Sequence, residues 1–401
     1  MADPYPWKWE RIGAMSQDPK MTARDLLEQL QRTNGMKRNE PLTREAIKKD
    51  LPPSFRENAL ERMGGDESKA DEFENENFEL LEDADQKKPT PYEEPWTYQL
   101  MRGLAEQIET AANSILKPAP RLPTFGTLPL GQLNAMAFAV PDSTEHLIAF
   151  QHGVFGFANL LTKAVAASFP PKISGDGISF DADLPAIERA LAADATPINR
   201  LDEFLGAYIV AGHPHAAQQY FLPQPFSYLA EIWLAGFELF IFGHELGHVA
   251  AGHLAALQAQ LRNLQPNALE VPHPDWRLEF EADEIGQMLA LKAVSERNVD
   301  LGLSYCGVDL VFSAIELVDR AVSTLLYGEV RPAPETETHP PASRRREVTR
   351  HHLSVFGEEQ ANAAVELASL LQQVLEAMWD RLEPRFEARH KEGIRPVPSW
   401  Q

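Results

Sequence analysis

Apolar side chains recur every three or four residues along much of the chain, which is the period of a helix with one buried face. We predict helices where this period is clearest, at 98–116, 155–168, 184–192, 227–261, 276–297, 305–328 and 357–386. A shorter helix is predicted from Thr22 to Arg32, because the threonine can cap it and leucines follow at helical spacing. The pattern therefore indicates a mostly helical protein.

One segment departs from the helical period and has the pattern of a β-hairpin. Residues 134–140 (NAMAFAV) are expected to form one strand, 141–145 (PDSTE) the turn, and 146–150 the returning strand. We therefore predict an α+β fold in which a small antiparallel sheet accompanies the helices.

Polar composition sets the first 95 residues apart. Segment 66–95 holds twelve acidic residues and three lysines, so it has little apolar surface to bury. We expect 1–95 to be a polar, partly disordered arm; a less favoured alternative is that its acidic segment lies over a cleft as an inhibitor. A folded domain is expected over 96–350, with an insertion at about 151–230. An amphipathic C-terminal helix is expected over 351–401, either packed on the core or available to a partner.

Charge and cysteine content narrow the possible surroundings. A net charge of −22 repels phosphates and anionic lipids, so neither nucleic acid nor a membrane surface is expected as the main partner. The single cysteine, Cys306, cannot form an internal disulfide, which favours a reducing compartment. The longest apolar run, 232–242, contains Glu238 and is shorter than the roughly 20 residues that cross a bilayer. We expect a cytoplasmic protein without a membrane span, and we leave its oligomeric state open.

The stretch 242–253 (FGHELGHVAAGH) carries the strongest chemical signal. His244 and His248 are four residues apart and share one helix face, which suits two imidazoles on one zinc ion. Glu245 is offset by about 100° around the helix axis, so its carboxylate can act as general base on a water at the metal. This is the HExxH arrangement of zinc peptidases. The alternative is a core helix whose histidines are satisfied by hydrogen bonds.

A third zinc ligand is expected from the acidic stretch 279–286 (EFEADEIG). Glu279 can bind the metal while Asp283, four residues later on the same face, accepts a hydrogen bond from a ligand histidine. Glu281 lies on another face and is the weaker candidate. Taken alone, the cluster could equally be a solvated helix face.

Together, "HELGHVAAGH" and "EFEAD" resemble the CAAX-prenyl-protease and HtpX-like zinc metallopeptidases, which are gluzincins. The resemblance implies a mostly helical zincin-like fold, a Zn²⁺ cofactor and protein or peptide substrates. In the family, the glutamate of an ExxxD pattern is the third zinc ligand. The resemblance therefore implies that Glu279 is this ligand and that Asp283 is the aspartate of the pattern. His253 matches a histidine often found five residues past the motif, and its role is left open.

Two further stretches resemble motifs of the same family. The predicted strand 134–140 is similar to an edge strand whose backbone pairs with an extended substrate, which implies contacts at Asn134, Ala135, Ala137 and Phe138. Residues 338–346 (THPPASRRR) resemble a His-Pro loop, in which His339 and Arg345 would stabilise the oxyanion. A basic cluster after such a loop can also be a solvated surface.

The chain departs from the family in two ways. The membrane-embedded branch of the family has transmembrane helices, whereas we expect none here. The segment 151–230 between the hairpin and the HExxH motif is also longer than is usual in the family. The leading hypothesis is a soluble zinc endopeptidase with Glu245 as general base. One alternative is a catalytically idle relative that binds proteins through the edge strand and the C-terminal helix. Another is a zinc hydrolase with a small substrate. Within the insertion, His213 and His215 could hold a second metal, although a polar surface loop is the favoured interpretation.

Overall fold

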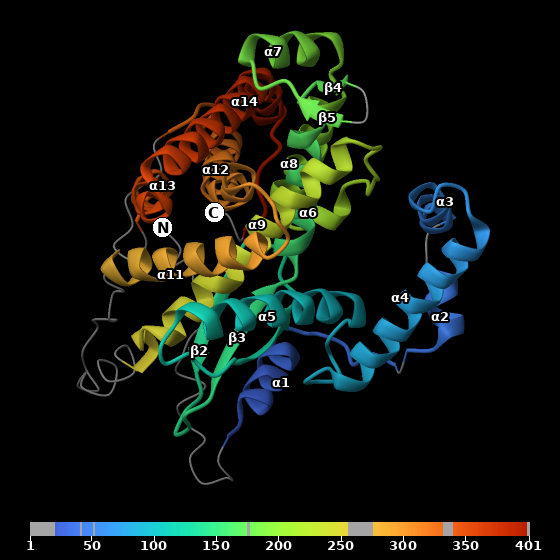
Figure 1. Ribbon diagram of the computed structural model, residues 1–401, viewed down its shortest axis with the longest axis vertical. Helices are drawn as coiled ribbons and strands as arrows, with labels where there is room; N and C mark the ends of the chain where they lie inside the picture. Colours follow the sequence, from blue (N-terminus) through green and yellow to red (C-terminus); the bar gives the residue numbers. More distant parts are fainter. Residues whose placement is uncertain are drawn as a thin grey trace.

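The computed structural model describes residues 21–40, 42–50, 53–174, 177–255, 276–331 and 340–398, and it is mostly helical with a small mixed sheet (Figure 1). The predicted α+β class is therefore confirmed. The helices are α1 (Ala23–Thr33), α2 (Arg44–Asp50), α3 (Pro53–Arg62), α4 (Glu67–Lys87), α5 (Pro95–Ile115), α6 (Gly153–Ala166), α7 (Leu184–Ala193), α8 (Thr196–Val210), α9 (Phe226–Ala250), α11 (Trp276–Ser295), α12 (Leu301–Tyr327), α13 (Ala342–His352) and α14 (Glu358–Lys391), with short 3-10 turns η2 (Pro214–Ala216) and η3 (Leu353–Phe356). The strands are β1 (Thr124–Leu128), β2 (Ala135–Ala139), β3 (His146–Gln151), β4 (Pro171–Ser174) and β5 (Gly177–Phe180).

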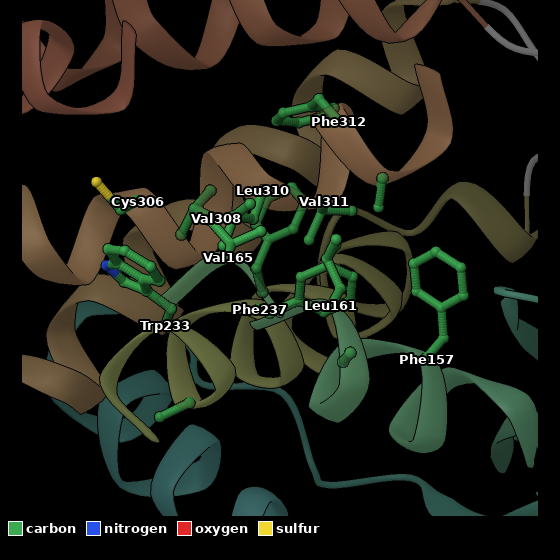
Figure 2. Packing of buried hydrophobic residues seen from close by; sticks show 14 of the residues in the cluster. Phe157, Leu161, Val165, Trp233, Phe237, Cys306, Val308, Leu310, Val311 and Phe312 are labelled. Atoms are coloured by element: carbon green, nitrogen blue, oxygen red, sulfur yellow. The ribbon is translucent and has the colours of Figure 1, made fainter. Parts of the chain in front are cut away.

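The main core surrounds α9, which is apolar on most of its circumference and packs against α6, α11 and α12. Figure 2 shows Trp233 and Phe237 of α9 among side chains of α6 and α12, including Leu161, Val165 and Phe312. A helix that is apolar nearly all round is stable only when other elements cover it. The segment that carries the HExxH motif is therefore held rigidly from several sides.

Helices α9 and α11 approach so closely that their backbones touch at glycines. A Cβ atom at Gly286 of α11 would lie 2.7 Å from the backbone nitrogen of His244. A Cβ atom at Gly247 of α9 would lie 2.9 Å from the carbonyl oxygen of Ala282. Only residues without a side chain permit this spacing, so the small residues flanking the motif determine how near the two helices lie.

The predicted hairpin is confirmed as β2 and β3, which pair antiparallel. The sheet is mixed rather than purely antiparallel, because β1 joins the other side of β3 in parallel, in the order β1-β3-β2. The β1 strand has only five residues and no regular alternation, which is why its sequence did not predict it. Strand β2 is left at the sheet edge, beside α9.

The acidic segment, which we expected to belong to a polar and partly disordered arm, forms a helix over most of its length. Helix α4 starts at the N-cap Asp66 and buries Ala70, Phe78, Leu81 and Ala84, which recur at helical spacing within the acidic run. These few apolar groups are enough for packing because α5 and a small cluster with α2 receive them. Figure 1 shows α2 to α4 at the side of α5, away from α12 and α14. An inhibitory role for the segment stays a prediction.

The C-terminal helix packs on the core, which is one of the two alternatives left by the sequence. Helix α14 lies along α12 and buries an apolar stripe from Ala361 to Phe386. Helix α9, by contrast, is shorter than predicted: it ends at Ala250 instead of continuing to residue 261. The chain turns at Gly252, whose φ of +74° is not helical.

Among the described residues, two helices, Phe226–Ala250 and Leu301–Tyr327, are long and apolar enough to cross a membrane, and 61% and 78% of their apolar windows are buried within the protein. Core helices of water-soluble proteins share these properties, so the expected lack of a membrane span stays a prediction.

The contact between α1 and β1 is predicted to weaken as the pH rises. Glu93 is buried there and accepts hydrogen bonds from Gln31 and from the N–H and hydroxyl of Thr127. Burial outweighs these bonds and raises the pKa of Glu93 from 4.5 to about 7. The folded protein therefore keeps a proton that the unfolded chain loses, so stability declines as the pH rises from about 4.5 to 7.

We expect deprotonation of Glu93 to lower the free energy of unfolding by up to about 3 kcal/mol between pH 5 and pH 8. The variant Glu93→Gln should lose that part of the pH dependence. Urea denaturation of both proteins at the two pH values measures the difference. Equal pH dependence in parent and variant would contradict the assignment.

Candidate metal centre

Two histidines of α9 and one glutamate of α11 converge in the described part of the chain. The Nε2 atoms of His244 and His248 lie 3.1 Å apart. The Glu279 carboxylate oxygens lie 3.7 Å from the first nitrogen and 3.5 Å from the second. Ligands on a tetrahedral zinc ion at 2.0–2.1 Å are separated by about 3.3 Å. The three predicted ligands therefore have the spacing and the donor types that zinc requires.

Asp283 is positioned to orient the first ligand. Its Oδ1 lies 2.9 Å from Nδ1 of His244, and the carboxylate is fully buried. A hydrogen on Nδ1 leaves the lone pair of His244 Nε2 directed at His248 and Glu279. Such outer hydrogen bonds select the tautomer and the ring orientation of metal-binding histidines. The role predicted for Asp283 agrees with this geometry.

Arg345 reaches the site, and its main contact is Asp283. Its Nε lies 2.8 Å from Oδ2 and its Nη2 lies 2.6 Å from Oδ1 of that carboxylate. Nη1 is 3.9 Å from Glu279. These contacts make Arg345 the counter-charge of a buried aspartate, and the pKa of Asp283 falls to about 2 because this pairing outweighs burial. Its oxyanion role stays a prediction, and His339 lies outside the described residues.

The pKa values of His244 and His248 shift in opposite directions. Burial, with the charges of His244 and His253, lowers the pKa of His248 to about 2, so its ring is neutral. Burial also acts to lower the pKa of His244, but the hydrogen bond and charge of Asp283 outweigh it and raise that pKa.

His253 has a contact that its sequence position did not reveal. The turn at Gly252 brings its Nδ1 to 3.0 Å from Nδ1 of His248, and its Nε2 lies 3.3 Å from Glu281. When Nε2 of His248 is turned to the metal, its Nδ1 carries the hydrogen and donates to His253. Glu281 thus lies at the far end of this series of hydrogen bonds. Its side chain is 57% exposed and is not directed at the candidate ligands.

Glu245 lies between the ligand helix and the edge strand. Its side chain is buried, and its carboxylate accepts a hydrogen bond from the backbone N–H of Ala137 in β2. Burial raises the pKa of Glu245 to about 7, with a further upward contribution from Glu279 that His244 and Ala137 oppose. A carboxylate near neutrality can both accept and deliver a proton.

The register of β2 shows which backbone groups face outward. Bonds from Val140 N–H to Glu145 and from Gln151 N–H to Asn134 flank the hairpin. In an antiparallel pair, hydrogen-bonded and non-hydrogen-bonded positions alternate, so Ala135 and Ala137 direct their backbone groups away from β3. Among the four predicted substrate contacts, Ala135 and Ala137 therefore direct backbone groups to the edge, where the N–H of Ala137 donates to Glu245. Asn134 and Phe138 pair inward, and the Phe138 side chain packs toward α1.

Comparisons with known proteins were made on the whole chain. No family model matches it, and neither the curated proteins nor the solved structures contain a match. The resemblance to gluzincins therefore depends on the motifs quoted above.

We predict that Glu279, and not Glu281, holds the metal. The variant Glu279→Gln should bind one equivalent of zinc fewer than the parent, because an amide is a much poorer zinc ligand than a carboxylate. Glu281→Gln, two residues along the same helix, is the matched control and should keep the parent stoichiometry. Equilibrium dialysis followed by elemental analysis gives the zinc per chain. Equal losses in the two variants would disprove the assignment.

Proposed function

We propose that the protein is a zinc-dependent endopeptidase with a zincin-like fold. The observation that carries this proposal is the position of Glu245. Its carboxylate adjoins the ligand pair on α9 and accepts a hydrogen bond from the edge strand at Ala137. A candidate general base, a set of zinc-type ligands and the edge of the sheet thus meet at one place. Hydrolysis of a bound peptide would use all three together.

An extended peptide would bind by adding a strand to β2. The outward backbone groups of Ala135 and the carbonyl of Ala137 would form the hydrogen bonds, which recognise backbone rather than sequence. Binding there places a peptide carbonyl near Glu245. Side chains on alternate positions of the peptide would provide any preference among substrates.

Glu245 would take a proton from the attacking water and pass it to the leaving amine. Zinc, when held by His244, His248 and Glu279, supplies a Lewis acid that activates water and polarises a carbonyl. Asp283 keeps the His244 ring in the ligating tautomer, and Arg345 balances the charge of Asp283. In this proposal Arg345, with His339, also stabilises the oxyanion.

The binding-only alternative receives less support. A module that only captures proteins through β2 needs no buried base and no complete ligand set. The C-terminal helix, its second proposed surface, buries its apolar stripe against α12. A zinc hydrolase for small substrates would use the same ligands and base, but the strand edge favours peptides as substrates. A peptide or protein partner and a cytoplasmic location remain predictions.

Glu245→Gln should keep the zinc and lose cleavage. Removing a general base typically costs about 10²- to 10⁴-fold in rate. Degradation of unfolded casein, with and without a chelator, measures the activity. Glu238→Gln is a matched control, because Glu238 is also buried on α9 and lies seven residues earlier on nearly the same face. Cleavage by Glu245→Gln at the parent rate would exclude Glu245 as the base.

Ala135→Pro should impair substrate binding without breaking the sheet. Proline removes an N–H that points away from β3, so the bonds between β2 and β3 remain. Losing one substrate hydrogen bond of about 1 kcal/mol lowers kcat/KM about fivefold or more. Ala135→Gly keeps the N–H and should behave like the parent. Steady-state cleavage of a fluorogenic peptide separates these outcomes, and equal activity in both variants would argue against strand addition.

A further inference from the structure

Three histidines from two distant parts of the chain meet away from the HExxH helix. His152 lies between β3 and α6, whereas His213 and His215 flank Pro214 in the connection from α8 to α9. One ring nitrogen from each lies within 4.8 Å of those from the other two. The ring centroids are 4.6 to 5.9 Å apart. From the sequence, only His213 and His215 were considered as a possible second metal site, and a polar surface loop was the favoured interpretation.

The convergence is built into the packing of the backbone. A Cβ atom at Gly156 would lie 2.6 Å from Nε2 of His215, so that ring occupies the space which the glycine leaves. Close by, a Cβ atom at Gly131 would lie 1.8 Å from the carbonyl oxygen of Gly212. The segments that carry the histidines are therefore locked together, which is not expected of a solvated loop.

His152 is oriented by a chain of hydrogen bonds. The hydroxyl of Thr97 donates to Glu94 at 2.9 Å and lies 3.0 Å from Nε2 of His152. Because its single hydrogen is used on Glu94, the hydroxyl must accept from Nε2–H of His152. The lone pair of this neutral ring is then on Nδ1. A carboxylate that fixes a histidine tautomer in this way is typical of the surroundings of metal ligands.

We propose that His152, His213 and His215 form a second metal site, which takes one divalent transition-metal ion of the zinc type. Three imidazoles without thiolate favour zinc, copper or nickel over calcium and magnesium. Burial of the rings lowers the pKa values of His152 and His213 to about 4, so both are neutral and able to bind at physiological pH. His215 is exposed, which leaves room for a solvent ligand.

Metal binding requires small adjustments. The ring nitrogens must close to about 3.3 Å, and Nδ1 of His213 must give up the 3.1 Å hydrogen bond that it accepts from the His215 backbone. The site would then link the β3–α6 junction to the turn after α8, which packs against α6 and α8. Strand β3 pairs with the edge strand β2 on its other side. The second ion would therefore brace the end of β3, and the inference does not depend on peptidase activity.

The test counts metal ions in the full-length protein. Protein stripped by a chelator is reloaded with Zn²⁺, dialysed and analysed for zinc per chain. We expect two equivalents in the parent, one in Glu279→Gln, and none in Glu279→Gln combined with His215→Asn. His351→Asn, an exposed histidine outside both groups, is the control and should leave the Glu279→Gln value at one.

The outcomes separate the two sites. One equivalent in the parent and none in Glu279→Gln would overturn the second site while supporting the first. One equivalent in both, lost on His215→Asn, would support the second site and contradict the first. Circular dichroism checks that each variant is folded.

If His215→Asn is unfolded, Co²⁺ titration of Glu279→Gln still decides the question. A visible absorption band of tetrahedral cobalt, weakened at least tenfold in affinity by Gly156→Ala, supports the site. Absence of the band disproves it.

Discussion

The contact between α9 and α11 is the constraint on which the candidate centre depends. Imidazole and carboxylate side chains are short, so two helices can share one ion only when their axes lie unusually close. Gly243, Gly247 and Gly286 permit that approach, because a methyl group at any of them would collide with the opposite backbone. Once the backbones touch, His244 and Glu279 lie within ligand distance of each other. The small residues around the motif are therefore as much a part of the centre as the ligands themselves.

Charge balance explains why the polar groups can be buried there. Asp283 and Glu279 are inaccessible to solvent, and a buried carboxylate is costly unless it is paired. Arg345 pairs with Asp283, and the His244 ring lies beside both carboxylates. A divalent ion held as we propose would add further positive charge beside Glu279 and Glu245.

The small sheet connects the parts of the molecule that our proposals involve. Strand β2 contacts the base through Ala137, and β3 ends at His152 of the three-histidine group. Strand β1 meets α1 through the buried Glu93 network. Only three strands are present in this sheet, but each places one functional or stabilising group. Because β2 lies at the edge of the described sheet, no second strand pairs with its outward side, in contrast to a central strand.

Local geometry let the sequence determine the helices and the hairpin. It also showed that the candidate ligands have the spacing of a metal site. Side chains four residues apart share a helix face in any fold, so the pairs His244–His248 and Glu279–Asp283 were predictable from spacing alone. The tertiary structure alone decided which faces meet. It paired Arg345 with Asp283, turned His253 back at Gly252, and brought His152 to a loop some sixty residues later in the chain. It also packed the acidic helix α4, whose few apolar groups are buried only because α5 and α2 receive them. Such outcomes depend on long-range contacts, for which the periodicity of a single segment contains no information.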